Sequence, residues 1–276
     1  TAVGGYALDA NTTASNNTAM GYAALGANTD GADNVAVGAY ALDANTTGNY
    51  NTAFGKNTLG ANTTASYNTA FGTTSLYTNT TGSHNTTVGA DSLKENTTAS
   101  NNTACGYAAL KENTTGEDNT AVGYLALTAN TTANDNTAVG KNSLASNTTG
   151  SQNTAIGDQS LANNTTASNN TACGRNAMGS NTTGTQNVAV GTQALDENTT
   201  GSNNVAIGFD ASTLSNGGNN VAIGKAAYAA SNTINGTVAI GYEAFNRLAT
   251  GNHNIAIGYQ AGDHYTSTTD TTIIGY

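Results

Sequence analysis

The chain has 276 residues, only 9% of them charged, and its formal net charge is −10 at pH 7. Seven Lys and Arg residues stand against seventeen Asp and Glu residues, so the sequence lacks the basic stripe that nucleic acid or an anionic membrane surface would need. It also contains no apolar run long enough for a transmembrane helix. We therefore expect no nucleic acid partner and no membrane insertion.

A sequence motif, represented by NTAVGYLALTANTTAND at residues 119–135, recurs along the whole chain with a period of 17 residues. The glycine that closes NTAVG falls at every seventeenth residue from Gly4 to Gly208, and then at Gly224, Gly241, Gly258 and Gly275, with one residue lost before Gly224. A fixed short period predicts a stack of units that contact only their neighbours. Below, one such unit is called a coil, and positions are counted from its glycine, from −5 to +11.

The coils divide the chain into two regions. Residues 1–207 form a regular repeat, whereas residues 208–276 are predicted to be divergent coils of the same solenoid. In the second region the Asn-Thr-Thr turn disappears, and Leu at position +4 gives way to Ser212, Tyr228, Phe245 and Gly262. Individual loops of this kind are expected at a specialised end or at a junction.

Two apolar columns suggest the path of each coil. Position −1 is apolar in every copy, and position −3 is Thr, Val or Ile, so strand alternation places both on one face, which we interpret as the core. The glycine permits a bend, and Leu at position +4 forms a second column, interpreted as a second strand. The fold class is therefore all-β: a parallel β-solenoid, or β-roll, of about sixteen coils with two short strands in each.

Asparagine at position +7 indicates a turn in which stacked side-chain amides bond from coil to coil. Eleven Asn-Thr-Thr triplets begin at this position, and each is also a formal glycosylation sequon. An inward ladder leaves no room for a glycan, whereas an outward column could carry a row of them. In a bacterial or phage context the ladder is the favoured interpretation.

Position −2 is Ala in fifteen of seventeen copies, the exceptions being Thr87 and Ile273. Alternation from the apolar column at −1 directs this Ala outward, and an exposed face would not restrict size. We therefore predict that parallel copies associate through the Ala columns, most simply as a homotrimer. The alternative is a monomeric solenoid whose Ala columns are crowded against its own turns.

No residue is predicted to be catalytic, cofactor-binding or metal-binding, and the chain is not expected to be an enzyme. His84, His253 and His264 lack Cys or carboxylate partners at metal-ligand spacing. Cys105 and Cys173, both at position −1, are predicted to be buried and unbridged.

Glu95 and Glu112 lie one coil apart in one column, a separation that a glycosidase could use. The neighbouring Lys94 and Lys111 favour a solvated set of charge partners instead.

Two ligand surfaces stay open as alternatives. A tyrosine column at position +1 could stack on a cell-surface glycan, together with the C-terminal loops; its members are Tyr22, Tyr107, Tyr124, Tyr242, Tyr259 and Tyr276. Ice binding is a third possibility, because regular threonines on a flat face can order water. That function needs a repeated Thr-x-Thr on one strand, whereas the adjacent threonines here lie at a turn.

The motifs NNVAIG at residues 203–208 and 219–224 and NIAIGYQAG at residues 254–262 resemble the head repeats of trimeric autotransporter adhesins. The longer pattern NTAVGYxALxxNTTGxxN is more similar to the repeat shafts of bacteriophage tail fibres and related surface proteins, although its coils are longer than those of the adhesin heads. This resemblance implies a left-handed trimeric β-roll. It further implies an extracellular structural fibre, on a virion tail or a cell surface, that extends a binding tip toward a host.

Overall fold

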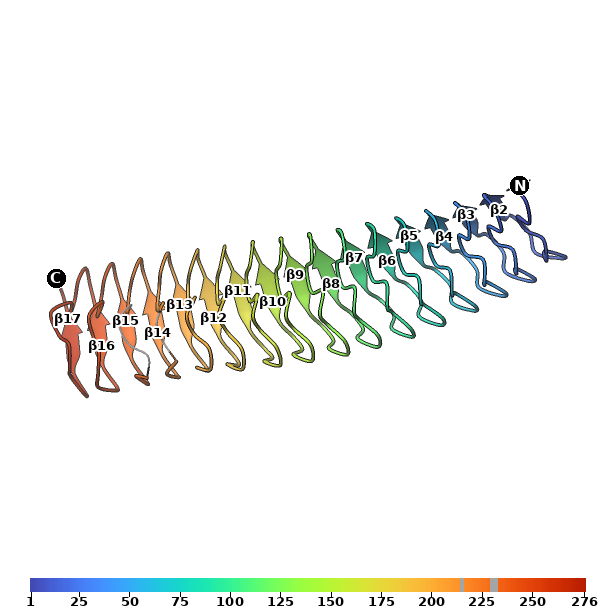
Figure 1. The fold of residues 1–276 in the computed structure, drawn as a ribbon. Helices are drawn as coiled ribbons and strands as arrows, with labels where there is room; N and C mark the ends of the chain where they lie inside the picture. Colours follow the sequence, from blue (N-terminus) through green and yellow to red (C-terminus); the bar gives the residue numbers. More distant parts are fainter. Residues whose placement is uncertain (214–215, 229–232) are drawn as a thin grey trace. The chain divides into compact units, whose positions relative to one another are not determined.

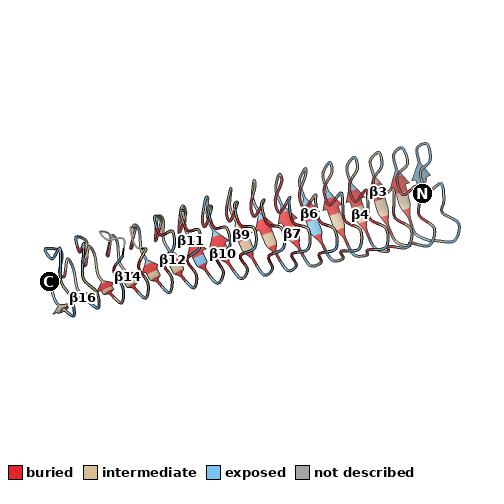
Figure 2. Ribbon diagram, turned by 60° about the horizontal axis from the view of Figure 1, so that its bottom comes forward, coloured by how far each residue is buried: buried red, intermediate tan, exposed pale blue. Residues whose placement is uncertain are grey.

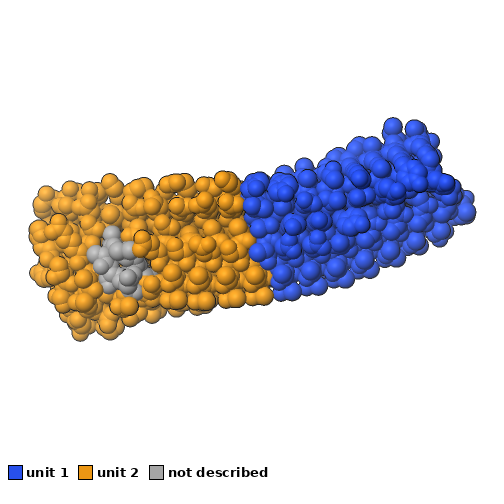
Figure 3. Space-filling model, viewed as in Figure 1, with its two compact units in different colours: residues 1–136 blue, residues 137–276 orange. Residues whose placement is uncertain are grey.

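A computed structural model describes residues 1–213, 216–228 and 233–276, which form two compact units, residues 1–136 and 137–276 (Figures 1 and 3). The division falls within the regular coils and is separate from the change in coil sequence at residue 208. The C-terminal loop positions 214–215 and 229–232 lie outside the described residues. No helix occurs in the described part of the chain.

Each coil contributes one short strand, and the strands of each unit follow one another in sequence order (Figure 1). The first unit contains β1 (Ala2–Val3), β2 (Thr18–Met20), β3 (Val35–Val37), β4 (Thr52–Phe54), β5 (Thr69–Phe71), β6 (Thr86–Val88), β7 (Thr103–Cys105) and β8 (Thr120–Val122). The second contains β9 (Thr137–Val139), β10 (Thr154–Ile156), β11 (Thr171–Cys173), β12 (Val188–Val190), β13 (Val205–Ile207), β14 (Val221–Ile223), β15 (Val238–Ile240), β16 (Ile255–Ile257) and β17 (Thr272–Ile274).

Neighbouring strands within a unit pair in parallel with equivalent residues side by side. Thr52 pairs with Thr69, and Val205 pairs with Val221 across the shortened coil. Main-chain bonds continue beyond the strands, as where the N–H of Val35 donates to the carbonyl of Asn51 at 2.9 Å. The predicted parallel β-solenoid with a spacing of 17 residues is therefore confirmed.

The inward and outward faces of each strand are exchanged relative to the sequence-based prediction. Ala at position −2 points into the core: Ala53, Ala121 and Ala155 are fully buried. The apolar column at −1 points outward, with Met20 46% exposed and Phe54 37% exposed, and the strands from β2 to β16 each combine a buried middle residue with two more exposed ones (Figure 2). The assignment of −1 and −3 to the core was wrong, as was the proposed association through the Ala columns.

The thinness of the coil explains the inversion. Leu at +4, Ala or a small hydroxyl residue at +3, and Asn at +7 and −4 fill the interior, as Leu59, Ser75, Asn62 and Asn68 illustrate, all of them fully buried. Little space is left beside them, so the inward position of the strand accepts Ala and not Val or Phe. The restricted size at −2 therefore reflects packing within one chain.

The second strand predicted near position +4 is not formed. Leu59, at +4, has φ 52°, and Asn57, at +2, has φ 58°, so the chain makes tight left-handed bends there. Coil-to-coil bonding persists nevertheless, because the N–H of Leu59 donates to the carbonyl of Ser75 at 3.1 Å. A three-residue strand and a sequence of turns therefore make up each coil.

Asparagine ladders line the interior, as predicted for position +7. Asn79 Nδ2 donates to Asn62 Oδ1 at 3.0 Å and to the Gly82 carbonyl at 2.9 Å, and Asn79 Oδ1 accepts from Asn96 Nδ2 at 2.8 Å. A second ladder runs at position −4, where the Asn68 main-chain N–H donates to Asn51 Oδ1 at 3.1 Å. In the first ladder the sequon asparagines from Asn45 to Asn198 are fully buried, so the folded coils leave no room there for a glycan.

The divergent coils vary the core by compensating sizes in the +4 column. Tyr228 is 1% exposed and follows the small Ser212, whereas Phe245 is fully buried and precedes Gly262. A Cβ on Gly262 would lie 2.5 Å from Cε1 of Phe245, so the aromatic ring occupies space that only glycine leaves free. The two large residues of this column, Tyr228 and Phe245, are therefore flanked by the small residues Ser212 and Gly262.

Candidate functional site

The most regular surface of each unit is formed by strand positions −3 and −1, here called the outer strand face. Within a strand, alternation sends these two side chains away from the core while Ala or Thr at −2 points inward. Position −1 is occupied only by Val, Ile, Phe, Met or Cys, and position −3 only by Thr, Val or Ile. The face therefore carries no charged side chain.

Large apolar groups on this face are in contact with solvent in the single chain. Val88 is 44% exposed and Ile156 is 42% exposed, and the rings of Phe54 and Phe71 stack at 4.9 Å between centroids. Because equivalent residues pair between strands, the exposed groups repeat with the coil spacing of about 4.8 Å. Rows of exposed apolar side chains are a common feature of protein interaction sites.

The two cysteines lie on the same face. Cys105 ends β7 and Cys173 ends β11, and both are exposed free thiols. Their predicted burial was wrong for the same reason as that of the other residues at −1. The sequence analysis did not identify which of the alternating strand positions faces the core. The small, nearly uniform Ala at −2 was the signal that could have identified it.

The tyrosines of the +1 column are exposed except for the half-buried Tyr242, and all but Tyr22 stack on a neighbouring ring of the column. Tyr107 and Tyr124 stack at 5.5 Å, and Tyr259 stacks on Tyr242 at 5.1 Å and on Tyr276 at 5.4 Å. Within such a stack the ring faces are largely occupied by neighbouring rings. Glycan binding by this column remains a prediction.

Tyr242, Glu243 and Gln260 form a polar cluster beside the C-terminal tyrosine stack. Glu243 accepts a hydrogen bond from Gln260 Nε2 at 2.9 Å, and this bond, followed by one from Tyr242, lowers the pKa of the Glu243 carboxyl. The same interaction with Glu243 raises the pKa of the Tyr242 hydroxyl. The cluster is a chain of surface hydrogen bonds.

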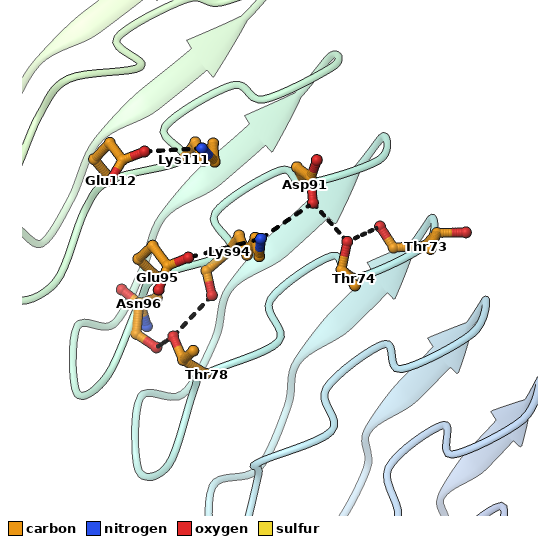
Figure 4. Close-up of polar contacts among 9 residues, drawn as sticks. All are labelled: Thr73, Thr74, Thr78, Asp91, Lys94, Glu95, Asn96, Lys111 and Glu112. Atoms are coloured by element: carbon orange, nitrogen blue, oxygen red, sulfur yellow. Dashed lines mark hydrogen bonds and ion pairs between the residues drawn. The ribbon is translucent and has the colours of Figure 1, made fainter.

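The carboxylates Glu95 and Glu112 are each paired with a lysine of their own coil (Figure 4). Lys111 Nζ lies 3.0 Å from Glu112 Oε1, and its contact with Glu112 raises the Lys111 pKa. Lys94 Nζ lies 3.9 Å from Glu95 Oε1 and 3.7 Å from Asp91 Oδ1. This arrangement is the solvated set of charge partners favoured by the sequence, with pairing inside each coil.

The histidines are separated and engaged with different neighbours. The His84 ring stacks on Tyr67 at 5.0 Å, and His253 Nδ1 lies 3.5 Å from Asp270 Oδ1, whereas His264 is exposed. Among the described residues, no group of three or more His, Cys, Asp and Glu side chains could hold a metal ion.

Threonines at the +8 turn use their hydroxyls inside the stack. Thr46 Oγ1 donates to the Thr63 carbonyl at 3.1 Å, and Thr80 Oγ1 donates to the Thr97 carbonyl at 2.9 Å. A separate threonine column at −3 lies on the outer strand face beside an apolar residue at −1, so these strands have the pattern Thr-x-apolar. Ice binding therefore remains a prediction without the repeated Thr-x-Thr.

No helix that could span a bilayer occurs in residues 1–213, 216–228 or 233–276. No protein-family model matches the chain, and no curated protein matches it. The outer strand face extends over the strands of both units.

Proposed function

We propose that the chain is a structural shaft that associates with parallel copies of itself through the outer strand face. The observation that carries this proposal is the unbroken apolar column at position −1, beside a column of Thr, Val or Ile at position −3, with no charged side chain at either position in both units. The proposed function is mechanical: the shaft holds a binding tip away from the surface to which it is attached.

The extent of the face supports association. With eight strands in the first unit and nine in the second, each face covers roughly 300–400 Å² at ordinary strand dimensions. Each face by itself is therefore about half of the roughly 800 Å² per partner that a stable protein interface buries. Exposure of the apolar side chains at −1 over this area is unfavourable in water unless a partner covers them.

A second copy of the same chain is a suitable partner because the face is periodic. Parallel copies in register present the same coil spacing, so Val, Ile and Phe side chains of one copy meet equivalent rows of the next. A closed trimer would shield every outer strand face with one repeated contact. This proposal keeps the expected homotrimer and places its interface on the residues opposite to those first predicted.

Coil-to-coil bonding supports the mechanical role. Within each unit, successive coils are joined by main-chain bonds, such as Thr52 N–H to the Asn68 carbonyl at 2.8 Å, and the regular coils also by amide ladders, such as Asn62 Nδ2 to Asn45 Oδ1 at 2.9 Å. Bending between coils would lengthen these bonds. Such a stack resists bending without needing a large hydrophobic core.

The location follows the resemblance of the repeats to tail-fibre shafts and adhesin heads. We propose an extracellular fibre, on a virion tail or a cell surface, that contributes to host or surface attachment without enzymatic turnover. Polysaccharide depolymerisation by the purified chain would contradict the non-enzymatic part of this proposal.

The mass of the native particle, measured by analytical ultracentrifugation, tests the association. We expect a mass of three chains for the unmodified protein and of one chain for the double variant Phe54→Asp/Phe71→Asp, because buried carboxylates without partners destabilise an interface.

The chain offers a matched control in the same two coils. Tyr50 and Tyr67 also form a stacked pair, at 5.0 Å, and are 52% and 53% exposed, but they lie at position −5 outside the outer strand face. That position carries Asp in other coils, including Asp33 and Asp118. Tyr50→Asp/Tyr67→Asp should therefore retain the oligomer. A one-chain mass for the unmodified protein, or dissociation by the control alone, would refute the proposed interface.

A further inference from the structure

A groove of about 310 Å³ opens on the first unit, away from the outer strand face. It is lined by Tyr40, Asp43, Asn57, Gly60, Ala61 and Tyr77, which come from positions +2, +5 and +6 of three consecutive coils. Its volume is at the lower end of the range for small-molecule sites, about 300–1,000 Å³. We propose that this groove binds one neutral pyranose unit of a glycan.

Gly60 creates the hollow. In the +5 column it stands between Asp43 of the preceding coil and Tyr77 of the following coil. A Cβ on Gly60 would lie 2.8 Å from Cε2 and 3.0 Å from Cδ2 of Tyr77, so the tyrosine ring extends over the glycine. The absence of a side chain at Gly60 therefore leaves a depression bordered by an aromatic ring.

The aromatic walls differ from the stacked tyrosine column. Tyr77 is 39% exposed, and its ring stacks on no other aromatic ring in the described part of the chain. Tyr40 meets Tyr22 edge to face, with an interplanar angle of 72° at 5.4 Å, and is 40% exposed. Unstacked phenol rings can contact the C–H face of a pyranose, and their hydroxyls can reach its polar rim.

Polar groups in the same groove match sugar hydroxyls. The half-buried Asp43 carboxylate accepts hydrogen bonds, and the Asn57 amide both donates and accepts them. Burial raises the pKa of the Asp43 carboxyl, while bonds from the main-chain N–H groups of Asp43 and Ala44 lower it. The carboxylate and the net charge of −10 disfavour sialic or uronic acids, so a neutral sugar is the expected ligand.

A second groove, of about 260 Å³, provides a comparison within the molecule. It uses the same columns in the second unit, where Gly179 stands at +5 and its Cβ would lie 2.8 Å from Asp196 Oδ1. Asn176 occupies the position equivalent to Asn57, but no aromatic residue lines this groove. It has the carboxylate and the amide without the rings, so it should not bind the sugar.

None of the groove residues belongs to positions −3 or −1, so the inference goes beyond the shaft proposal and does not depend on it. A chain that proved monomeric could still carry the site.

Saturation-transfer NMR with methyl glycosides of glucose, galactose and mannose tests the proposal, with N-acetylneuraminic acid as the anionic probe. We expect at least one neutral glycoside to bind with a dissociation constant on the order of 1 mM, as is usual for so small a ligand. Gly60→Ala fills the hollow and displaces the Tyr77 ring, and Tyr77→Ala removes that ring. Each should weaken binding by about tenfold or more.

Gly179→Ala, which fills the comparison groove, should leave binding within about twofold. Thermal unfolding of each variant verifies that it is folded. If Tyr77→Ala does not fold, binding by Gly60→Ala decides the question. The proposal is overturned by the absence of any neutral-sugar signal, by unchanged binding in Gly60→Ala, by equal loss in Gly179→Ala, or by preference for the anionic probe.

Discussion

The hydroxyl oxygens of Ser75 and Thr87 lie 2.6 Å apart in the core, where both side chains are fully buried. Thr87 replaces the usual Ala at position −2 of β6, and Ser75 occupies position +3 of the preceding coil. The one polar residue at −2 therefore has a polar partner across the interior. This pair shows directly that position −2 faces inward.

Ser75→Ala should destabilise the coil by about 1–3 kcal/mol, because it leaves the Thr87 hydroxyl buried without that partner. Thr87→Ala should cost less, since a serine at +3 can instead bond within its turn, as Ser143 Oγ does to the Gly140 carbonyl at 3.0 Å. The double variant restores the Ala-containing arrangement of other coils and should recover most of the loss. Thermal unfolding of the four proteins measures the coupling, and additive losses would contradict the pairing.

Asn79→Asp should destabilise the inner ladder by about 3 kcal/mol or more. The substitution keeps the size but removes the Nδ2 donor, which serves Asn62 Oδ1 and the Gly82 carbonyl, and places a carboxylate in the core. Hydrogen exchange of the neighbouring amides measures the local effect, which suits an array of repeats better than a single unfolding midpoint.

Asn101→Asp is the matched control for the ladder, because Asn101 is exposed at position −5, where Asp33 and Asp118 occur in equivalent left-handed conformations. It should leave exchange nearly unchanged. If the neighbouring amides were equally protected from hydrogen exchange in both variants, the ladder would contribute little to local stability.

Periodicity was sufficient to predict the stack, because a 17-residue spacing leaves equivalent residues side by side whichever way a strand faces. The ladder at +7 was predictable too, since buried amides need partners that recur with the same spacing. The direction in which each strand position faces was not predicted. Phe54 and Phe71 were assigned to the core on apolarity alone, although the interior has room only for Ala53 and Ala70 at that level. Apolarity does not distinguish a core from an interface, whereas the volume available inside the coil does.

The candidate sites were less predictable for a related reason. The groove at Tyr40 and Tyr77 combines residues from three coils at positions that vary from copy to copy, so no single repeat displays it. Only Gly60 between Asp43 and Tyr77 in the +5 column gave a sign in the sequence, and its meaning required the direction of the Tyr77 ring.

Cys105 reports on the proposed interface because its exposed thiol lies on the outer strand face, two coils beyond Phe71. We expect a thiol-specific reagent to modify Cys105 slowly in the assembled protein and at least tenfold faster in Phe54→Asp/Phe71→Asp, where the face is open to solvent. Peptide mass spectrometry over time measures the rate. Rapid modification of the unmodified protein at a concentration where it is oligomeric would contradict coverage of this face.

Asp196→Asn should stabilise the second unit at pH 7, by at most about 0.5 kcal/mol for this half-exposed group. Burial, followed by repulsion from Glu197, raises the folded-state pKa of Asp196 above 3.8. The ionised carboxylate therefore opposes folding above that raised pKa, and the penalty disappears as pH falls toward 3.8 and the folded state binds its proton. The two unfolding midpoints should differ at pH 7 and converge near pH 3, with the exposed Asp158→Asn as the control. A difference that grows in acid would contradict the sign.

Gly55→Ala should lower the free energy of unfolding by about 3 kcal/mol or more, which is a larger loss than Gly60→Ala should cause. Gly55 has φ 135°, and its Cβ would lie 2.6 Å from the Gly72 carbonyl oxygen, a main-chain atom that is held by the coil stack. Gly60 lacks a positive φ, and the added methyl would meet the movable Tyr77 ring, so Gly60→Ala should cost within about 1 kcal/mol. Chemical unfolding of both variants measures the difference. Because both add the same methyl to the same coil, equal stabilities would show that the bend after each strand does not require glycine, and the account of how the coil turns would fail.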